Sequence, residues 1–237
     1  MYYTLTVFHY RWNTVFLHFQ YFKSGEARKM WILMILCGAL AGYLSLLLSK
    51  KLIIARKGEI PQKGLVTGKY APLFWVTLGS AGFGLIQLFD AGLLRNAEYA
   101  VVYLICLCIG AVDFTIRKIP NSLLLALIAN RTLFLALNFS KDELKLSLWG
   151  FGAAVVIFML PSLLKINVGA GDIKLAAITG FYLGVNGFLQ AMIIMAVTIT
   201  IYGFYLMIRR IGNLRSKTAM GPYLVFGMFC SMLFPVI

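Results

Sequence analysis

The sequence predicts an all-α, polytopic integral membrane protein with about eight transmembrane helices. Of its 237 residues, 61% are hydrophobic and the mean hydropathy is +0.85, whereas soluble domains contain about 45–50% apolar residues. The hydrophobic residues form separate stretches, most of them long enough to cross a ~30 Å hydrocarbon core as helices. Basic residues gather in alternate loops, which is typical of a chain that crosses a membrane repeatedly.

Composition also excludes several classes of function. The formal net charge is +14, but no basic stripe carries a nucleic-acid-binding motif, so membrane topology and anionic lipid explain the charge better. The four cysteines all lie in apolar segments and form no CxxC pair, which argues against a zinc site or a disulfide framework. The two histidines, His9 and His18, precede the first strong membrane segment. We therefore expect no metal, no cofactor and no histidine-dependent hydrolase.

The chain divides into an N-terminal extension, residues 1–29, and a membrane domain, residues 30–237. The extension is rich in aromatic residues and is interrupted by basic ones. Two interpretations stay open for it: an interfacial amphipathic helix, or an upstream segment with Met30 as the true start.

Eight apolar segments are expected to form the membrane helices: 30–49, 70–89, 97–112, 119–136, 146–164, 173–185, 188–208 and 222–236. A basic loop, residues 50–69, separates the first two. Pro120 falls in the first turn of the fourth helix, where proline is tolerated, and Arg131 is expected to snorkel from its outer half. The sixth and seventh helices share only a tight turn at 184–187. The sixth helix is too short to cross a full bilayer. We therefore expect Asp172, at its start, to lie inside the membrane or in a locally thinned region.

The distribution of basic residues predicts the orientation. Loops 50–69, 113–118, 165–174 and 209–217 together hold 14 Lys and Arg, whereas loops 90–96 and 137–145 hold 3. The positive-inside rule places the first set in the cytoplasm. The N-terminal extension, with four basic residues, would then lie outside against the rule, and a start at Met30 would remove this conflict.

Asp113 and Asp172 are the acids that lie at helix boundaries on the predicted cytoplasmic side. A carboxylate in or beside hydrocarbon costs about 2.5–3.5 kcal/mol by insertion scales, so it is usually retained for a function. The glycines flanking Asp172 let another chain approach its carboxyl group. Two carboxyl groups in one site are not easily ionised together, so such a pair shares one proton and can activate water. The alternative is that each acid merely pairs with a nearby cation, Arg117 or Lys174.

Three separated motifs resemble those of the type IV prepilin peptidase family. The segment Gly169-Ala-Gly-Asp-Ile-Lys-Leu175 resembles its GxGD motif, and Asp113 followed by Ile119-Pro-Asn121 resembles its first aspartate and the Ile-Pro-Asn/Asp that comes after it. The segment Met220-Gly-Pro-Tyr223 with Gly227 resembles the Gly-Pro segment that opens the last helix. The resemblance covers residues 30–237 in order.

This resemblance implies an aspartic endopeptidase of the cell inner membrane. It would remove basic leaders from type IV prepilin-like or pseudopilin precursors, cutting after glycine at the cytoplasmic face. Asp113 and Asp172 would be the catalytic pair. The motif residues around them are assigned to substrate binding: Gly169, Gly171, Lys174, Pro120 and Asn121.

The chain departs from many full-length members of that family in one region. They carry a large cytoplasmic domain with paired CxxC motifs after the first helix, and here that place is taken by residues 50–69, which contain no cysteine. We therefore expect no zinc, and methyltransferase activity is doubtful. The residues alone also leave open an ion-coupled transporter or a catalytically silent assembly protein for pili or secretion.

Overall fold

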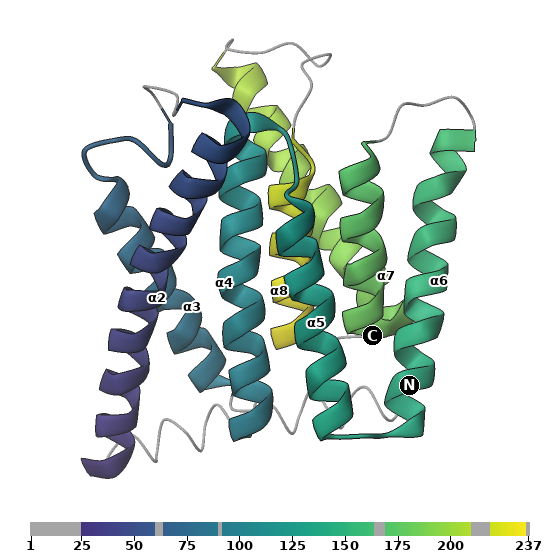
Figure 1. Cartoon of the computed structure of the whole chain (residues 1–237), viewed down its shortest axis with the longest axis horizontal. Helices are drawn as coiled ribbons and strands as arrows, with labels where there is room; N and C mark the ends of the chain where they lie inside the picture. The colour runs from purple at the N-terminus through teal and green to yellow at the C-terminus, as the bar shows by residue number, and fades with distance from the viewer. Residues whose placement is uncertain (1–24, 60–63, 90–91, 164–168, 210–218, 236–237) are drawn as a thin grey trace.

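The structure is a computed structural model that describes residues 25–59, 64–89, 92–163, 169–209 and 219–235. These residues form seven helices and no strand, so the predicted all-α class is confirmed (Figure 1). The extension 1–29 lies mostly outside the described residues. The helices are α2 (Gly25–Lys57), α3 (Ala71–Leu88), α4 (Leu93–Ile116), α5 (Asn121–Leu137), α6 (Lys141–Leu163), α7 (Ala170–Ile208) and α8 (Gly221–Leu233).

Five of these helices (α2, α3, α4, α6 and α7) are long and apolar enough to cross a membrane, and α5 and α8 are shorter apolar helices. The protein is therefore a multi-pass membrane protein, although the predicted number of about eight spans is not confirmed. Within α7 the helical conformation is interrupted at Gly184, with φ 69° and ψ −175°, so α7 contains the two helices expected over 173–185 and 188–208.

The helices pack side by side in one bundle, with α4 and α8 at its centre (Figure 1). At two crossings the backbones touch directly, Gly42 against Gly79 between α2 and α3, and Gly150 against Gly180 between α6 and α7. At each of these glycines a Cβ atom would overlap the facing backbone. Close approach through small residues is a common way for membrane helices to associate, since lipid provides no hydrophobic drive between them.

The first helix is longer than the sequence predicts, because residues 50–57 continue α2 instead of opening a loop. Ile53 explains the extension: it is fully buried and packs in a cluster with Trp75 of α3 and Val112 of α4. The connection to α3 is tied to the same cluster by Val66 and by a 3.1 Å hydrogen bond from Trp75 Nε1 to the carbonyl oxygen of Leu65.

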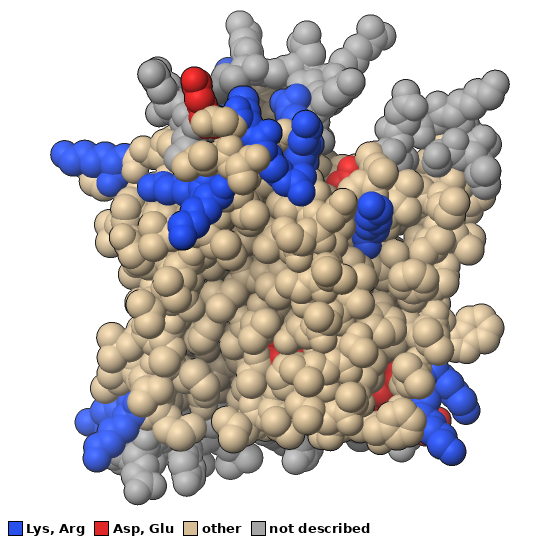
Figure 2. Space-filling model, in the orientation of Figure 1, with Lys and Arg blue, Asp and Glu red and all other residues tan. Residues whose placement is uncertain are grey.

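Charged side chains gather at the two ends of the bundle and leave an apolar band between them (Figure 2). One end, where α2 and α4 finish and α5, α7 and α8 begin, carries a dense group of Lys and Arg (Figures 1 and 2). We call it the aspartate end, because Asp113 and Asp172 both lie there.

Candidate active site

Asp113 lies in the last turns of α4, inside the helix and not in the loop that follows it. Only 4% of the residue is accessible. Arg117 ends the helix in the left-handed conformation, with φ 52°, and its backbone N–H donates to the Asp113 carbonyl oxygen at 2.8 Å. The chain then turns through Ile119 and Pro120 into α5. This reversal fixes the backbone of Asp113 at the aspartate end.

The Asp113 carboxyl group is held by the first residue of the last described helix. Its Oδ2 accepts a hydrogen bond of 3.0 Å from the backbone N–H of Gly221. That N–H is free to donate because the first N–H groups of a helix have no partner within it. A Cβ atom on Gly221 would lie 2.6 Å from the same oxygen. Only glycine therefore lets the backbone approach the carboxyl group so closely.

Asp172 lies in the first turn of α7, and Gly169 is the N-cap residue of that helix. The N–H groups of Asp172 and Ile173 donate to the Gly169 carbonyl oxygen at 2.9 and 3.2 Å. The Asp172 side chain is half-buried and folds back over the same glycine, since a Cβ on Gly169 would lie 2.8 Å from Asp172 Oδ2. A carboxyl group is electrostatically favoured at this end of a helix.

The fold brings these two aspartates, 59 positions apart in the sequence, into one site. The charge of Asp113 acts on the carboxyl group of Asp172. The start of α7 is drawn toward the α4–α5 connection by Gly171, where a Cβ would lie 3.3 Å from the Cβ of Ile119. Among the described residues, neither aspartate forms an ion pair. That the two carboxyl groups share a proton stays a prediction.

Lys174, the cation considered as a partner for Asp172, makes a different contact. Its Nζ donates to Asn121 Oδ1 at 3.5 Å, linking the first turns of α7 and α5. Both side chains are exposed, and Gly169 is exposed beside them. Pro120, in contrast, is buried at the start of α5. The structure thus places all five residues assigned to substrate binding around the two aspartates; their contact with a substrate stays a prediction.

Gly221 is the site residue that the sequence did not assign. The Gly-Pro motif marked the start of the last helix, but nothing in the motif says which side chain its N–H contacts. The two residues are 108 positions apart. The glycine itself is the feature that could have pointed to this contact. A glycine in the first turn of a helix suggests that another group approaches the backbone closely there.

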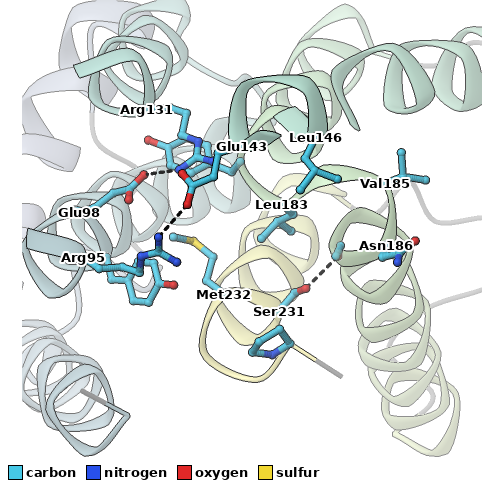
Figure 3. A pocket seen from close by; sticks show the side chains of 14 residues that line it. Arg95, Glu98, Arg131, Glu143, Leu146, Leu183, Val185, Asn186, Ser231 and Met232 are labelled. Carbon is cyan, nitrogen blue, oxygen red and sulfur yellow. Dashed lines mark hydrogen bonds and ion pairs between the residues drawn. The ribbon is translucent and has the colours of Figure 1, made fainter. Parts of the chain in front are cut away.

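A second cluster of charged residues lies at the other end of the bundle and lines a cavity of about 390 Å³ (Figure 3). Arg131 Nη1 pairs with Glu98 Oε1 at 3.1 Å, and Arg131 Nη2 donates to Ser147 Oγ at 3.2 Å. Arg95 pairs with Glu143 at 3.0 Å. We call Arg95, Glu98, Arg131 and Glu143 the arginine–glutamate cluster.

The position of Arg131 corrects the prediction that it snorkels toward the membrane surface. Its side chain is only 13% accessible and faces inward, because Glu98 on α4 and the ring of Tyr182, whose centroid is 5.6 Å from the guanidinium carbon, offer it partners inside the bundle. The cluster joins α4, α5 and α6.

The described residues contain no group of three or more His, Cys, Asp or Glu side chains arranged to hold a metal ion. The expectation that the protein uses no metal stays a prediction.

Residues 100–204 match the sequence model of the type IV leader peptidase family. The matched stretch includes both aspartates and ends before the Gly221 contact. Over these residues the resemblance to the prepilin peptidases is confirmed. No curated protein and no solved structure matches the chain.

Proposed function

From the match of residues 100–204 to the type IV leader peptidase family, we propose that this protein is a membrane aspartic endopeptidase. Its substrates are type IV prepilin-like or pseudopilin precursors, from which it removes the leader peptide. The observation that supports the proposal is that Asp113 and Asp172 lie at the same end of the bundle, near enough for the charge of Asp113 to act on Asp172, and that neither has an ion-pair partner among the described residues.

The chemistry requires the two carboxyl groups to share one proton. The ionised carboxylate takes a proton from a water molecule as the water oxygen attacks the peptide carbonyl carbon, and the protonated partner donates to the carbonyl oxygen. The tetrahedral intermediate then loses its C–N bond as the carboxyl group that gained the water proton passes it to the leaving amine, and the other carboxylate takes back a proton from a hydroxyl group of the intermediate. The Gly221 N–H holds one oxygen of Asp113 through this cycle and keeps the carboxyl group oriented.

The surroundings of the pair favour a precursor that is cut at the cytoplasmic face. The aspartate end carries most of the basic loops, and the positive-inside rule assigns such loops to the cytoplasm. The leader of the precursor lies on that side, and its cut point adjoins an apolar helix in the membrane. The backbone of the protein lies close to both carboxyl groups, at Gly169 beside Asp172 and at Gly221 beside Asp113. Little space is left there for a side chain, which favours a precursor with glycine before the scissile bond.

We expect cleavage with little or no methylation of the new N-terminus. The connection between α2 and α3 is short, so it has no core of its own to hold S-adenosylmethionine. Mass spectrometry of a precursor matured only by this protein measures both activities at once. A fully methylated product would contradict this expectation and leave the peptidase proposal intact.

The test of the proposal is leader removal by the purified protein in lipid nanodiscs. We expect the wild type to cut a prepilin-like precursor after its glycine, and a bulky residue in place of that glycine to block the cut. Asp113→Asn and Asp172→Asn should each reduce cleavage by about 10⁴-fold or more, the order seen when a catalytic group is removed. Asp142→Asn, the same change at an exposed position of α6, is the matched control. Wild-type rates in either catalytic variant would refute the mechanism.

A further inference from the structure

A groove with a volume of about 430 Å³ runs along α4 between α3 and α8. Both flanking helices pack against α4, which forms the floor. The lining atoms are almost entirely apolar, and no charged residue contributes to it. Small residues keep the floor hollow: a Cβ on Gly110 would meet only Val225 at 3.6 Å and Pro222 at 3.8 Å.

One end of the groove leads to the Asp113 carboxyl group. Cys106 and Gly110 on the floor precede Asp113 at spacings of seven and three residues, so all three lie on one face of α4. On the α8 side the groove begins at Pro222, the residue after the Gly221 N–H that binds Asp113. The groove therefore ends next to the proposed catalytic site.

The other end of the groove is closed. Phe89, which follows α3, and Phe234, which follows α8, meet edge to face with ring centroids 4.4 Å apart. From Pro222 to Phe234 the groove spans about 18 Å at 1.5 Å per residue, or roughly three turns of helix. The groove thus follows α8 over its whole length and ends where these two rings meet.

We infer that this groove binds the first three turns of the apolar helix that follows the cut point in the precursor. The inference rests on the proposed function and adds where the enzyme holds its substrate. A helix that lays one face into an apolar groove presents side chains at i, i+3, i+4 and i+7 and leaves its other face to lipid. With its start at Asp113, such a helix places the residues just before it beside both aspartates. The groove therefore sets the position of the cut.

The first experiment fills the groove far from the aspartates. Ala81→Trp on α3 places a large ring in the slot, and Ala129→Trp on α5 is the matched control at an exposed position outside it. Two substrates are compared: the full precursor, and a soluble peptide that carries the leader and ends a few residues after the cut. We expect Ala81→Trp to lower kcat/KM on the precursor by about tenfold or more, and to leave the peptide within about twofold of wild type. Ala129→Trp should leave both unchanged.

A wild-type rate for Ala81→Trp on the precursor, or an equal loss on both substrates, would overturn the inference while the peptidase proposal stands. If the wild type cuts neither substrate, the proposed function itself fails.

A second experiment measures binding without cleavage. In the Asp172→Asn background, a photo-reactive benzoylphenylalanine replaces Phe226 on the groove wall, or Val156 on α6 as the control; these residues are 51% and 60% accessible. We expect the precursor to cross-link at position 226 and not at 156. Cross-linking to lipid alone at 226, or equally to the precursor at both positions, would show that the groove is a lipid surface.

Discussion

The two clusters of acids lie at opposite ends of α4 and differ in their partners. Glu98, near the start of the helix, is neutralised by Arg131 across a 3.1 Å ion pair. Asp113 lies fifteen residues later, about 22 Å along the helix, where its carboxyl group accepts a backbone N–H and its charge acts on the carboxyl group of Asp172. We expect the acid that is paired with an arginine to serve the fold, and the acid that lies near a second acid to serve proton transfer. The partner, more than burial, separates the two roles.

The largest effect on stability is expected at the arginine–glutamate cluster. Arg131→Met leaves Glu98 buried and unpaired, which should lower the free energy of unfolding by about 3–5 kcal/mol. Thermal unfolding in detergent measures this loss, and kcat/KM per folded molecule should stay within about twofold of wild type. The double variant Arg131→Met with Glu98→Gln should recover most of the stability, because no uncompensated charge remains. If Arg131→Met abolished cleavage without changing Tm, the arginine–glutamate cluster would have a catalytic role, and the two clusters would not differ in function.

The next effect is on activity at the aspartate end. In Gly221→Ala the new Cβ would lie 2.6 Å from Asp113 Oδ2, so the carboxyl group must move away from the position that the N–H fixes. A displacement of this order should lower kcat/KM by about 100-fold, with little change in Tm. Gly152→Ala, where a Cβ meets nothing within 4 Å, is the control. Unchanged cleavage in Gly221→Ala would show that the contact does not position the acid.

A smaller loss of activity is expected for Gly169→Ala. The Cβ would lie 2.8 Å from Asp172 Oδ2, but this carboxyl group is half-buried and no described residue donates to it, so it can rotate aside. We expect kcat/KM to fall by about tenfold. Gly203→Ala, in the same helix with open space around it, should cleave at the wild-type rate. A loss as large as that of Gly221→Ala would mean that Asp172 is held as rigidly as Asp113.

The smallest effect is expected for Arg95→Met within the arginine–glutamate cluster. The Arg95 side chain is 48% accessible and its partner Glu143 is 35% accessible. Ion pairs this exposed contribute about 0–1 kcal/mol because solvent screens them. Thermal unfolding should therefore show a far smaller change than Arg131→Met. Equal losses in the two variants would show that the four residues act as one network and not as a buried pair beside an exposed one.

The sequence predicted the helices and the aspartate pair for related reasons. Long apolar stretches can satisfy their backbone in a membrane only as helices, and a charged residue at the edge of such a stretch stands out because it is costly. Asp113 and Asp172 could therefore be selected without knowing how the helices pack. The family match over residues 100–204 covers both positions, and their catalytic role stays a prediction.

Contacts that depend on which face each helix turns toward its neighbours could not be predicted from the sequence. Arg131 and Glu98 are 33 positions apart, and hydropathy does not say which face of α5 turns inward. Arg131 was therefore expected at the membrane surface. Lys50 and Lys51 suggested that the first helix ends there. It continues to Lys57, because Ile53 is buried against its neighbours. The local hydropathy pattern predicts that a helix forms, whereas tertiary packing determines where the helix ends and which residues it contacts.

The hydrogen bond from Gly221 to Asp113 also bears on how the protein is made. Helices enter the membrane in the order in which the ribosome produces them, so α4 is in place well before α8 has been synthesised. Until then Asp113 lacks the N–H that orients it, and Asp172 arrives only with α7. A nascent chain therefore lacks the Gly221 contact until its last described helix has inserted. Under the proposed function, we expect chains that end before α8 to cleave precursors poorly.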